Sequence, residues 1–312
     1  MENLFRQNKI YIKPVSGAYI KNGTLWMWGK NSFGRENPLT HQPTIVDVCG
    51  RTIHKIVLGM VCTLVLTEDK QLYVWGDHTH FVRLHYHPWL FSRDRFLDVC
   101  MGFDDTFAGV SADGGLYLWD GQSSKALKNF HIPETRILKC FFMPWIFGFT
   151  TEKGVIYLTN YGVDIAVPTV EEDFMIVDWK EQLNFQIKMV VHWEQTGGAI
   201  VLSTNGGLYH IPIGCDGDIV GTVNILRKNV VKAIYRLDIV PRSGSFRALY
   251  CLTRNGTLCY FKRDRYDSQK ILGYGKVFVD FDVTYLADSG HRIDTIDAKG
   301  NITQFIVDFS LH

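Results

Sequence analysis

A seven-fold repeat of a short turn-and-strand motif constrains this chain more than any other feature. The motif is a tight turn followed by a strand of the type Leu-Tyr-x-Trp, and the best copies occupy Asn22–Gly29, Asp69–Gly76 and Asp113–Trp119. With the second turn residue as a marker, the copies lie at positions 23, 70, 114, 154, 206, 256 and 300, at intervals of 47, 44, 40, 52, 50 and 44 residues. A period of this length with strand and turn content is typical of a β-propeller.

The repeat predicts an all-β fold in which one seven-bladed propeller spans residues 1–312. Each copy is interpreted as a four-stranded antiparallel blade. In the second copy we expect strands at 54–59, 62–67 and 71–75, and the outer strand follows a longer loop, as at 43–48 in the preceding copy. Asn-Gly turns accept positive φ at both central positions, which suits a tight hairpin. The large aromatics that end the motif are predicted to be core residues, not ligand-stacking residues.

Closure of the ring needs a fourth strand for the last blade. After the seventh hairpin, only Asp308–His312 remain, which is too short for a loop and a strand. We therefore expect Glu2–Gln7 to supply the outer strand of the last blade. The alternative is that Met1–Asn8 is a disordered leader, because free termini commonly are disordered.

Three local matches make the chain resemble the regulator of chromosome condensation repeat family. Trp28–Gly34 is similar to the family's Trp-Gly-x-Asn-x-x-Gly, and Val57–Leu66 is similar to its glycine-then-histidine strand pair, with Cys62 in place of the usual histidine. The turn plus Gly-x-Leu-Tyr-x-Trp-Gly completes the unit. The resemblance implies a seven-bladed ring of four-stranded sheets. The later copies lose the Trp-Gly pair, so the chain resembles a divergent member.

The composition excludes several classes of protein. Lys and Arg total 33 against 32 Asp and Glu, so the formal charge is +1 and no strong global field attracts nucleic acid, which is disfavoured as a partner though left open. No apolar run is long enough for a transmembrane helix or a secretory signal, so no membrane insertion is expected. The seven cysteines form no Cys-x-x-Cys pair and are interpreted as reduced thiols, which favours a cytoplasmic or nuclear location.

Candidate binding residues concentrate in irregular segments. Strand order places the loops between first and second strands and between third and outer strands on one face, opposite the tight turns. We expect four unusual loops there, at 78–95, 160–173, 193–198 and 238–246. The first has the composition of an interface centre. The predicted partner-binding residues are Phe81, Arg83, His85, His87, Trp89, Arg93, Arg95, Trp193 and Arg242.

The same segment carries four histidines from His78 to His87, which could ligate zinc, but no cysteine lies nearby and we expect no metal. No catalytic or cofactor-binding motif is present, so neither enzymatic activity nor a cofactor is expected.

The sequence therefore predicts a scaffold or adaptor that binds a protein or peptide partner through the face opposite the tight turns. Two alternatives stay open. One is a guanine-nucleotide exchange factor for a small Ras-like GTPase, which the resemblance implies because the name-giving family member serves the GTPase Ran; the other is an RNA- or chromatin-associated adaptor. The oligomeric state is not predicted.

Overall fold

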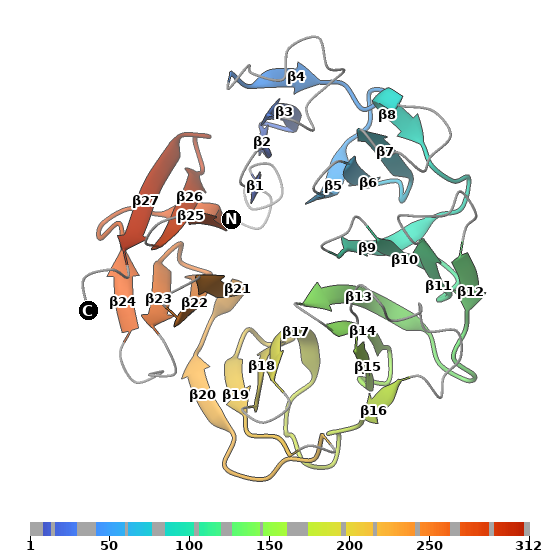
Figure 1. The fold of residues 1–312 in the computed structure, drawn as a ribbon, viewed down its shortest axis with the longest axis vertical. Helices are drawn as coiled ribbons and strands as arrows, with labels where there is room; N and C mark the ends of the chain where they lie inside the picture. The colour runs from blue at the N-terminus through green and yellow to red at the C-terminus, as the bar shows by residue number, and fades with distance from the viewer. Residues whose placement is uncertain are drawn as a thin grey trace.

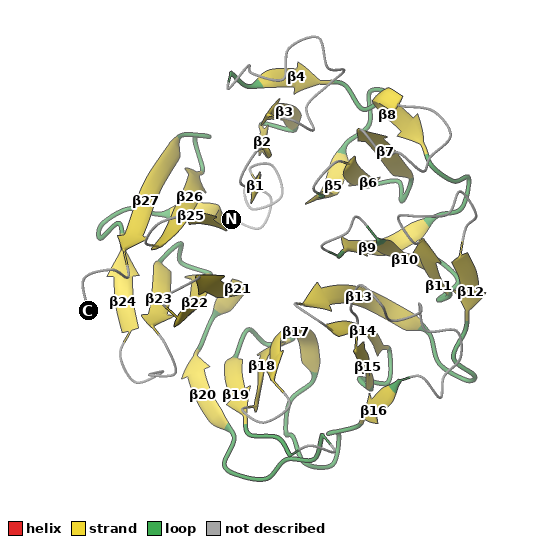
Figure 2. Cartoon of the chain, viewed as in Figure 1, coloured by secondary structure: helices red, strands yellow, loops and turns green. Residues whose placement is uncertain are grey.

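Seven antiparallel sheets stand as blades around a common axis in the computed structural model of the chain (Figure 1). The structure describes residues 9–13, 16–29, 42–59, 62–76, 85–102, 106–119, 127–143, 146–160, 174–194, 198–214, 217–240, 244–262, 269–286 and 290–308. Within these ranges the regular secondary structure consists of β-strands, which are joined by turns and loops (Figure 2). None of the described segments forms a helix that could span a membrane.

The strands follow one another from the ring's centre to its rim in each blade. Blade 1 contains β1 (Lys9–Lys13), β2 (Ser16–Lys21), β3 (Thr24–Gly29) and β4 (Thr44–Val46). Blade 2 contains β5 (Ile53–Leu58), β6 (Cys62–Thr67), β7 (Leu72–Gly76) and β8 (His85–Leu90). Blade 3 contains β9 (Phe96–Met101), β10 (Phe107–Ser111), β11 (Leu116–Trp119) and β12 (Leu127–Phe130). Blade 4 contains β13 (Ile137–Met143), β14 (Ile146–Thr151), β15 (Ile156–Asn160) and β16 (Met175–Val177).

The remaining three blades complete the ring. Blade 5 contains β17 (Ile187–Glu194), β18 (Gly198–Ser203), β19 (Leu208–Ile211) and β20 (Asn224–Arg227). Blade 6 contains β21 (Val230–Val240), β22 (Gly244–Thr253), β23 (Leu258–Lys262) and β24 (Gln269–Leu272). Blade 7 contains β25 (Phe278–Leu286), β26 (Gly290–Asp297) and β27 (Ile302–Asp308). The predicted seven-bladed, all-β propeller is confirmed.

Blade 7 has three strands within the described residues, whereas the other six blades have four. The fourth strand was expected from Glu2–Gln7, which lies outside the described residues, so this remains a prediction. The first described strand, β1, is the innermost strand of blade 1, and it lies against β25 of blade 7. Blades 1 and 7 therefore meet where the ring closes.

All seven marker positions of the repeat have positive φ. Six are glycines, and the seventh, Lys70, has a φ of 68°. Only the first turn follows the expected Asn-Gly geometry, because Asn22 (φ 52°) and Gly23 (φ 79°) are both left-handed. In the other two Asn-Gly turns the asparagine, Asn205 or Asn255, is not left-handed, and the expectation was wrong there.

A second hydrogen-bonding group explains this difference. In blade 3, Gly114 N–H donates to the Ser111 carbonyl (3.0 Å), and the Ser111 hydroxyl accepts from Gly115 N–H (2.9 Å). Ser203 and Thr253 hold the turns of blades 5 and 6 in the same way. A Ser or Thr at the end of the second strand thus fixes a longer turn, in which only the marker must be left-handed.

Of the three tryptophans that end the best copies of the motif, two are core residues as predicted. Trp75 and Trp119 are buried, whereas Trp28 is half-buried. The Trp119 ring stacks on Phe107, with centroids 4.7 Å apart, and meets the edge of Phe91, which follows the outer strand of the preceding blade, at 4.9 Å. Such aromatic contacts stabilise beyond their buried area. They join blade 2 to blade 3.

Two aspartates, Asp98 and Asp280, hold neighbouring blades together, and each of them links three consecutive blades. Asp98 of β9 accepts from Lys55 Nζ of blade 2 (2.7 Å) and from Cys140 N–H of blade 4 (3.3 Å). Asp280 of β25 accepts from Lys232 Nζ of blade 6 (2.8 Å) and, through its second oxygen, from Ile10 N–H of blade 1 (2.9 Å). We call each such arrangement an aspartate clasp. The Asp280 clasp spans the junction where the ring closes.

Backbone hydrogen bonds also join the blades at the tight turns. The carbonyl of the marker residue accepts from the first amide of the next blade's inner strand, at distances from 2.8 to 3.2 Å. The pairs are Lys70 with Phe96, Gly114 with Ile137, Gly206 with Val230 and Gly256 with Phe278. These bonds hold four of the junctions without using a side chain.

Candidate functional site

The ring has two faces. The turn face carries the tight turns and the connections from each outer strand to the next inner strand. The loop face carries the other two sets of connections. The contact between Ala112 N–H, in the tight turn of blade 3, and the Arg95 carbonyl (2.7 Å) places the segment after β8 on the turn face. The faces decide which of the predicted residues could act together.

The predicted loop at 78–95 contains the outer strand of blade 2, so the description of it as a loop was wrong. Strand β8 pairs with β7 through His85↔Gly76 and Trp89↔Val74. Pro88 is compatible with this strand because β8 is at the edge of the sheet, where a missing N–H costs nothing. Phe81 and Arg83 lie outside the described residues, as does the start of the His78–His87 cluster.

The predicted basic and aromatic residues of this segment are separated by the strand. Arg93 and Arg95 are exposed on the turn face, because they follow β8. Trp89 is 42% exposed on the rim, and its ring meets the edge of Phe91 at 6.0 Å. Of the predicted residues of this segment that the structure describes, Arg93 and Arg95 therefore lie on the turn face and Trp89 lies on the rim, so these three do not share one surface.

Trp193 is a core residue, which corrects its assignment to a binding surface. Its side chain is 4% exposed and stacks on Trp179, with ring centroids 5.7 Å apart and planes 10° apart. The Trp179 indole N–H donates to the Gly217 carbonyl (2.9 Å). The pair joins the connection after blade 4 to the inner strand of blade 5.

The predicted loop at 238–246 is largely a β-hairpin. Strands β21 and β22 stay paired through Asp238↔Phe246 to Val240↔Gly244, and at 11 and 10 residues they are longer than any other strand described. The alternating apolar residues of β21 continue the ladder beyond the usual inner-strand length. Arg242, between the two strands, lies outside the described residues.

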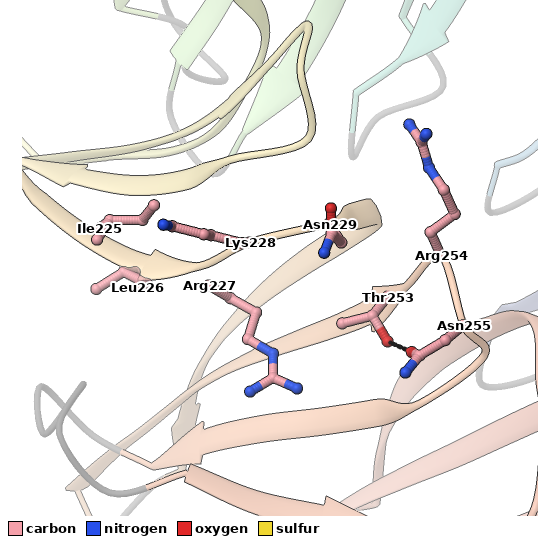
Figure 3. Close-up of a pocket in the computed structure, with 8 residues that line it drawn as sticks. All are labelled: Ile225, Leu226, Arg227, Lys228, Asn229, Thr253, Arg254 and Asn255. Atoms are coloured by element: carbon pink, nitrogen blue, oxygen red, sulfur yellow. Dashed lines mark hydrogen bonds between the residues drawn. The ribbon is translucent and has the colours of Figure 1, made fainter.

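A groove on the turn face was not predicted. It encloses about 670 Å³ where blade 5 meets blade 6 (Figure 3). Its walls are the end of β20 with the connection that follows, and the tight turn of blade 6. The lining residues are Ile225, Leu226, Arg227, Lys228, Asn229, Thr253, Arg254 and Asn255. We call this the basic groove, because three of the eight residues are cationic and none is acidic.

The three cations of the basic groove do not converge on one point. Figure 3 shows Arg227, Lys228 and Arg254 extending in three different directions. The Arg227 guanidinium donates to the Gln269 side chain of β24 (2.8 Å), which holds it toward blade 6. Arg254 N–H donates to the Asn229 carbonyl (2.6 Å), which fixes the turn against the connection. The groove therefore presents a spread of positive charge along its length.

A pair of thiols lies next to Arg227. Cys251 of β22 and Cys259 of β23 are register partners, and both are fully buried. A hydrogen bond from the Cys251 thiol and the positive charge of Arg227 lower the pKa of Cys259 to about 7, while burial opposes this. The same hydrogen bond, together with burial, raises the pKa of Cys251. Arg227 thus acts on both the groove and the thiol pair.

The basic groove had a signal in the sequence. Lys228 and Arg254 each precede an asparagine, at a connection and at a tight turn of consecutive blades. Placing cations relative to the turns would have identified them. Among the residues with described side chains, no group of three His, Cys, Asp or Glu is arranged to hold a metal ion.

Comparisons with known proteins agree with the fold. No known protein-family model matches the chain. A segment of 68 residues, 20% of this chain, is 31% identical to the E3 ubiquitin-protein ligase HERC2 of Homo sapiens, and the match spans only 1% of that protein's length. The same segment matches the Mus musculus protein equally well.

Solved structures match over nearly the whole chain. The yeast RCC1 protein, Prp20p of Saccharomyces cerevisiae, superposes with a TM-score of 0.57 at 13% identity, covering 98% of this chain and 83% of that one. BBS1N, solved in complex with ARL6DN, gives a TM-score of 0.61 at 10% identity, covering 95% and 88%. The resemblance to the regulator of chromosome condensation repeat propellers is thus confirmed for the fold.

Proposed function

We propose that the chain is a non-enzymatic interaction scaffold whose basic groove binds an extended, acidic segment of a protein partner. The observation that carries this proposal is the spread of Arg227, Lys228 and Arg254 along one groove without an acidic lining residue. A single small anion would need converging donors, whereas an extended chain can meet cations one after another. Complementary charge of this kind supports specificity and fast association.

The structural neighbours give independent support. Prp20p is described with its binding to Gsp1p and histones, and BBS1N is solved in complex with ARL6DN. Both are propellers of this fold with protein partners. A rigid ring with variable connections suits that role, because binding residues concentrate on loops held by a fixed scaffold.

The test compares two double variants in a quantitative pull-down from native cells. Lys228→Ala/Arg254→Ala removes two groove cations and leaves Arg227 with Gln269. Lys153→Ala/Lys299→Ala is the matched control, because both lysines are exposed at the tight turns of other blades. We expect the groove variant alone to lose the main partner, and the wild-type complex to weaken as salt rises. Equal retention by both variants would contradict the proposal.

The loop face is the competing surface. Trp89→Ala and removal of the tip of the β21–β22 hairpin change this face and the rim while leaving the basic groove intact. Loss of the partner in these variants, with retention in the groove variant, would assign binding to the face that the sequence favoured.

A second candidate is nucleotide exchange on a small Ras-like GTPase. The extended β21–β22 hairpin favours it, because a projecting element is what a wedge between a GTPase and its nucleotide requires. Release of labelled nucleotide from a panel of GTPases tests this activity. No acceleration at micromolar protein would exclude it.

We also propose a cytoplasmic or nuclear location. The six cysteines among the described residues are all free, which is compatible with a reducing compartment. Fluorescence microscopy of the tagged chain in native cells checks the compartment.

A further inference from the structure

A second cavity lies among the inner strands. It encloses about 630 Å³ and is lined by residues of β1, β5, β9, β13, β17 and β21, with Thr150 of β14. Small-molecule sites commonly have this size. The Lys9 ammonium donates to the His54 carbonyl, and His54 lies 3.4 Å from Glu68 in a tight turn, so the lysine end of the cavity opens toward the turn face. We call this end the channel mouth.

The inner strands place charged residues at equivalent positions around the channel mouth. Six of the seven inner strands contain an irregular register near their first residue, as in β5 between Ile53 and Lys55. The residue that follows this irregularity occupies the same level in each blade. With Lys9 of β1, which is regular, the seven positions are Lys9, Lys55, Asp98, Lys139, Met189, Lys232 and Asp280.

The aspartate clasps neutralise only part of this charge. Lys55 and Lys232 are paired with the two aspartates at 2.7 and 2.8 Å. Lys9 and Lys139 form no ion pair among the described residues, and Lys188, next to Met189, is a third lysine at the same end. Five lysines lie at this end with two aspartates, and Glu68 in the neighbouring tight turn also acts on Lys9, so the lysines outnumber the carboxylates by two.

The lysines without an ion pair carry a free-energy cost. Burial lowers the pKa of Lys9, as do the nearby charges of Lys232 and Lys55, while Asp280 and Glu68 act in the opposite direction. Burial and the charges of Lys188 and Lys55 lower the pKa of Lys139, although Asp98 acts in the opposite direction. Both ammonium groups are therefore less stable here than in water, and an anion between them would relieve desolvation and mutual repulsion at once.

We propose that the channel mouth binds a small polyphosphate anion, held by Lys9, Lys139 and Lys188. Lysine ammonium groups bind phosphate as compact point charges with three donors each. The cavity has the volume of a small-ligand site, which favours a soluble phosphate compound over a folded partner surface. The proposal uses none of the residues of the basic groove, so the two can fail separately.

Inorganic tripolyphosphate is the probe, and isothermal titration calorimetry against the full chain measures binding at fixed ionic strength. Lys9→Met/Lys139→Met is the test variant, and Lys153→Met/Lys299→Met is the matched control with the same change in net charge. We expect the test variant to bind about tenfold to a hundredfold more weakly for each lysine removed, and the control to bind like the wild type. An equal loss in both variants, or no binding to the wild type, would overturn the proposal.

Thermal unfolding of a single variant gives a second test, which still applies if the double variant differs in stability from the wild type. Lys139→Met alone is expected to raise the melting temperature of the ligand-free chain, because it removes a half-buried ammonium group that forms no ion pair, and to abolish most of the rise that tripolyphosphate causes in the wild type. A lower melting temperature without ligand would contradict the reasoning.

Two further probes distinguish other ligands. Vesicles containing phosphatidylinositol bisphosphate test whether a lipid headgroup supplies the phosphate, and binding that depends on Lys9 and Lys139 would keep the site and assign this source. An octaglutamate peptide tests the competing class. Binding of the peptide, but not of tripolyphosphate, with dependence on the same lysines would replace the proposed ligand by an acidic peptide.

Discussion

Removal of the Asp280 carboxylate should open the ring at the junction between blades 7 and 1. Asp280 is 6% exposed, and its two oxygens accept from Lys232 Nζ and from Ile10 N–H. Asp280→Ala leaves the buried amide of Ile10 without this acceptor, which costs about 1–3 kcal/mol. Lys232 is 31% exposed and also donates to the Phe281 carbonyl, so solvent limits the loss of its ion pair to about 1 kcal/mol. The free energy of unfolding should fall by about 2–4 kcal/mol.

Urea denaturation measures the total, and hydrogen exchange locates it. We expect faster exchange in β1, above all at the amide of Ile10, because this contact links β1 to blade 7. Asp280→Asn retains an acceptor oxygen and should lose about half as much. Asp98→Ala is the matched comparison, since Asp98 makes the equivalent contacts within the covalently continuous part of the ring. It should lose similar total stability without opening β1. A loss below about 1 kcal/mol in Asp280→Ala, with unchanged exchange in β1, would refute the clasp as a closing contact.

Three other predictions concern the turns, the thiols and the N-terminus. Lys70→Gly should raise the free energy of unfolding by about 0.5–1 kcal/mol, because the backbone of Lys70 is left-handed. Gly256→Ala should lower the free energy of unfolding by about 1–3 kcal/mol, because Gly256 is also left-handed and an added Cβ would lie 2.4 Å from a neighbouring atom. Urea denaturation measures both changes. The lowered pKa of Cys259 contributes stability that is fully present above about pH 9 and is lost as the pH falls through about 7. Because the charge of Arg227 helps to lower this pKa, Arg227→Met should raise it, which a titration followed by thiolate absorbance would show. A titration unchanged from wild type would contradict this. Deletion of Glu2–Gln7 should speed hydrogen exchange in β27 if this segment is the missing strand, and equal exchange rates would favour a disordered leader.

The turns and blades could be predicted because their signals are local. A left-handed residue marks each turn, and in blades 3, 5 and 6 a Ser or Thr side chain within the same hairpin holds it, so all seven markers could be found from local sequence. The position of Arg95 could not be predicted in the same manner. It depends on whether the segment before it contains an edge strand, and Pro88 and four histidines obscure the strand pattern there.

The cavities depend on relations between blades that no local pattern reveals. Arg227 and Arg254 belong to different blades. They line the same groove only because a two-residue connection places the end of β20 beside the next tight turn. The lysines of the channel mouth occupy equivalent levels, but the irregular register of the inner strands shifts them relative to the turns. Charge counted along the chain cancels to +1, which hides both local excesses.

The bonds from the marker carbonyls to the next inner strands have a consequence for how such a ring can change over time. Donor and acceptor are both main-chain atoms, so at these four junctions the bond does not depend on which side chains the two residues carry. Blades 5 and 6, which lack the tryptophan of the motif, keep this bond to the next blade through Gly206 and Gly256. We therefore expect that a blade bounded by two such turns can be replaced by a blade of a distant propeller. The success of such a graft should depend more on a matching turn than on a matching core.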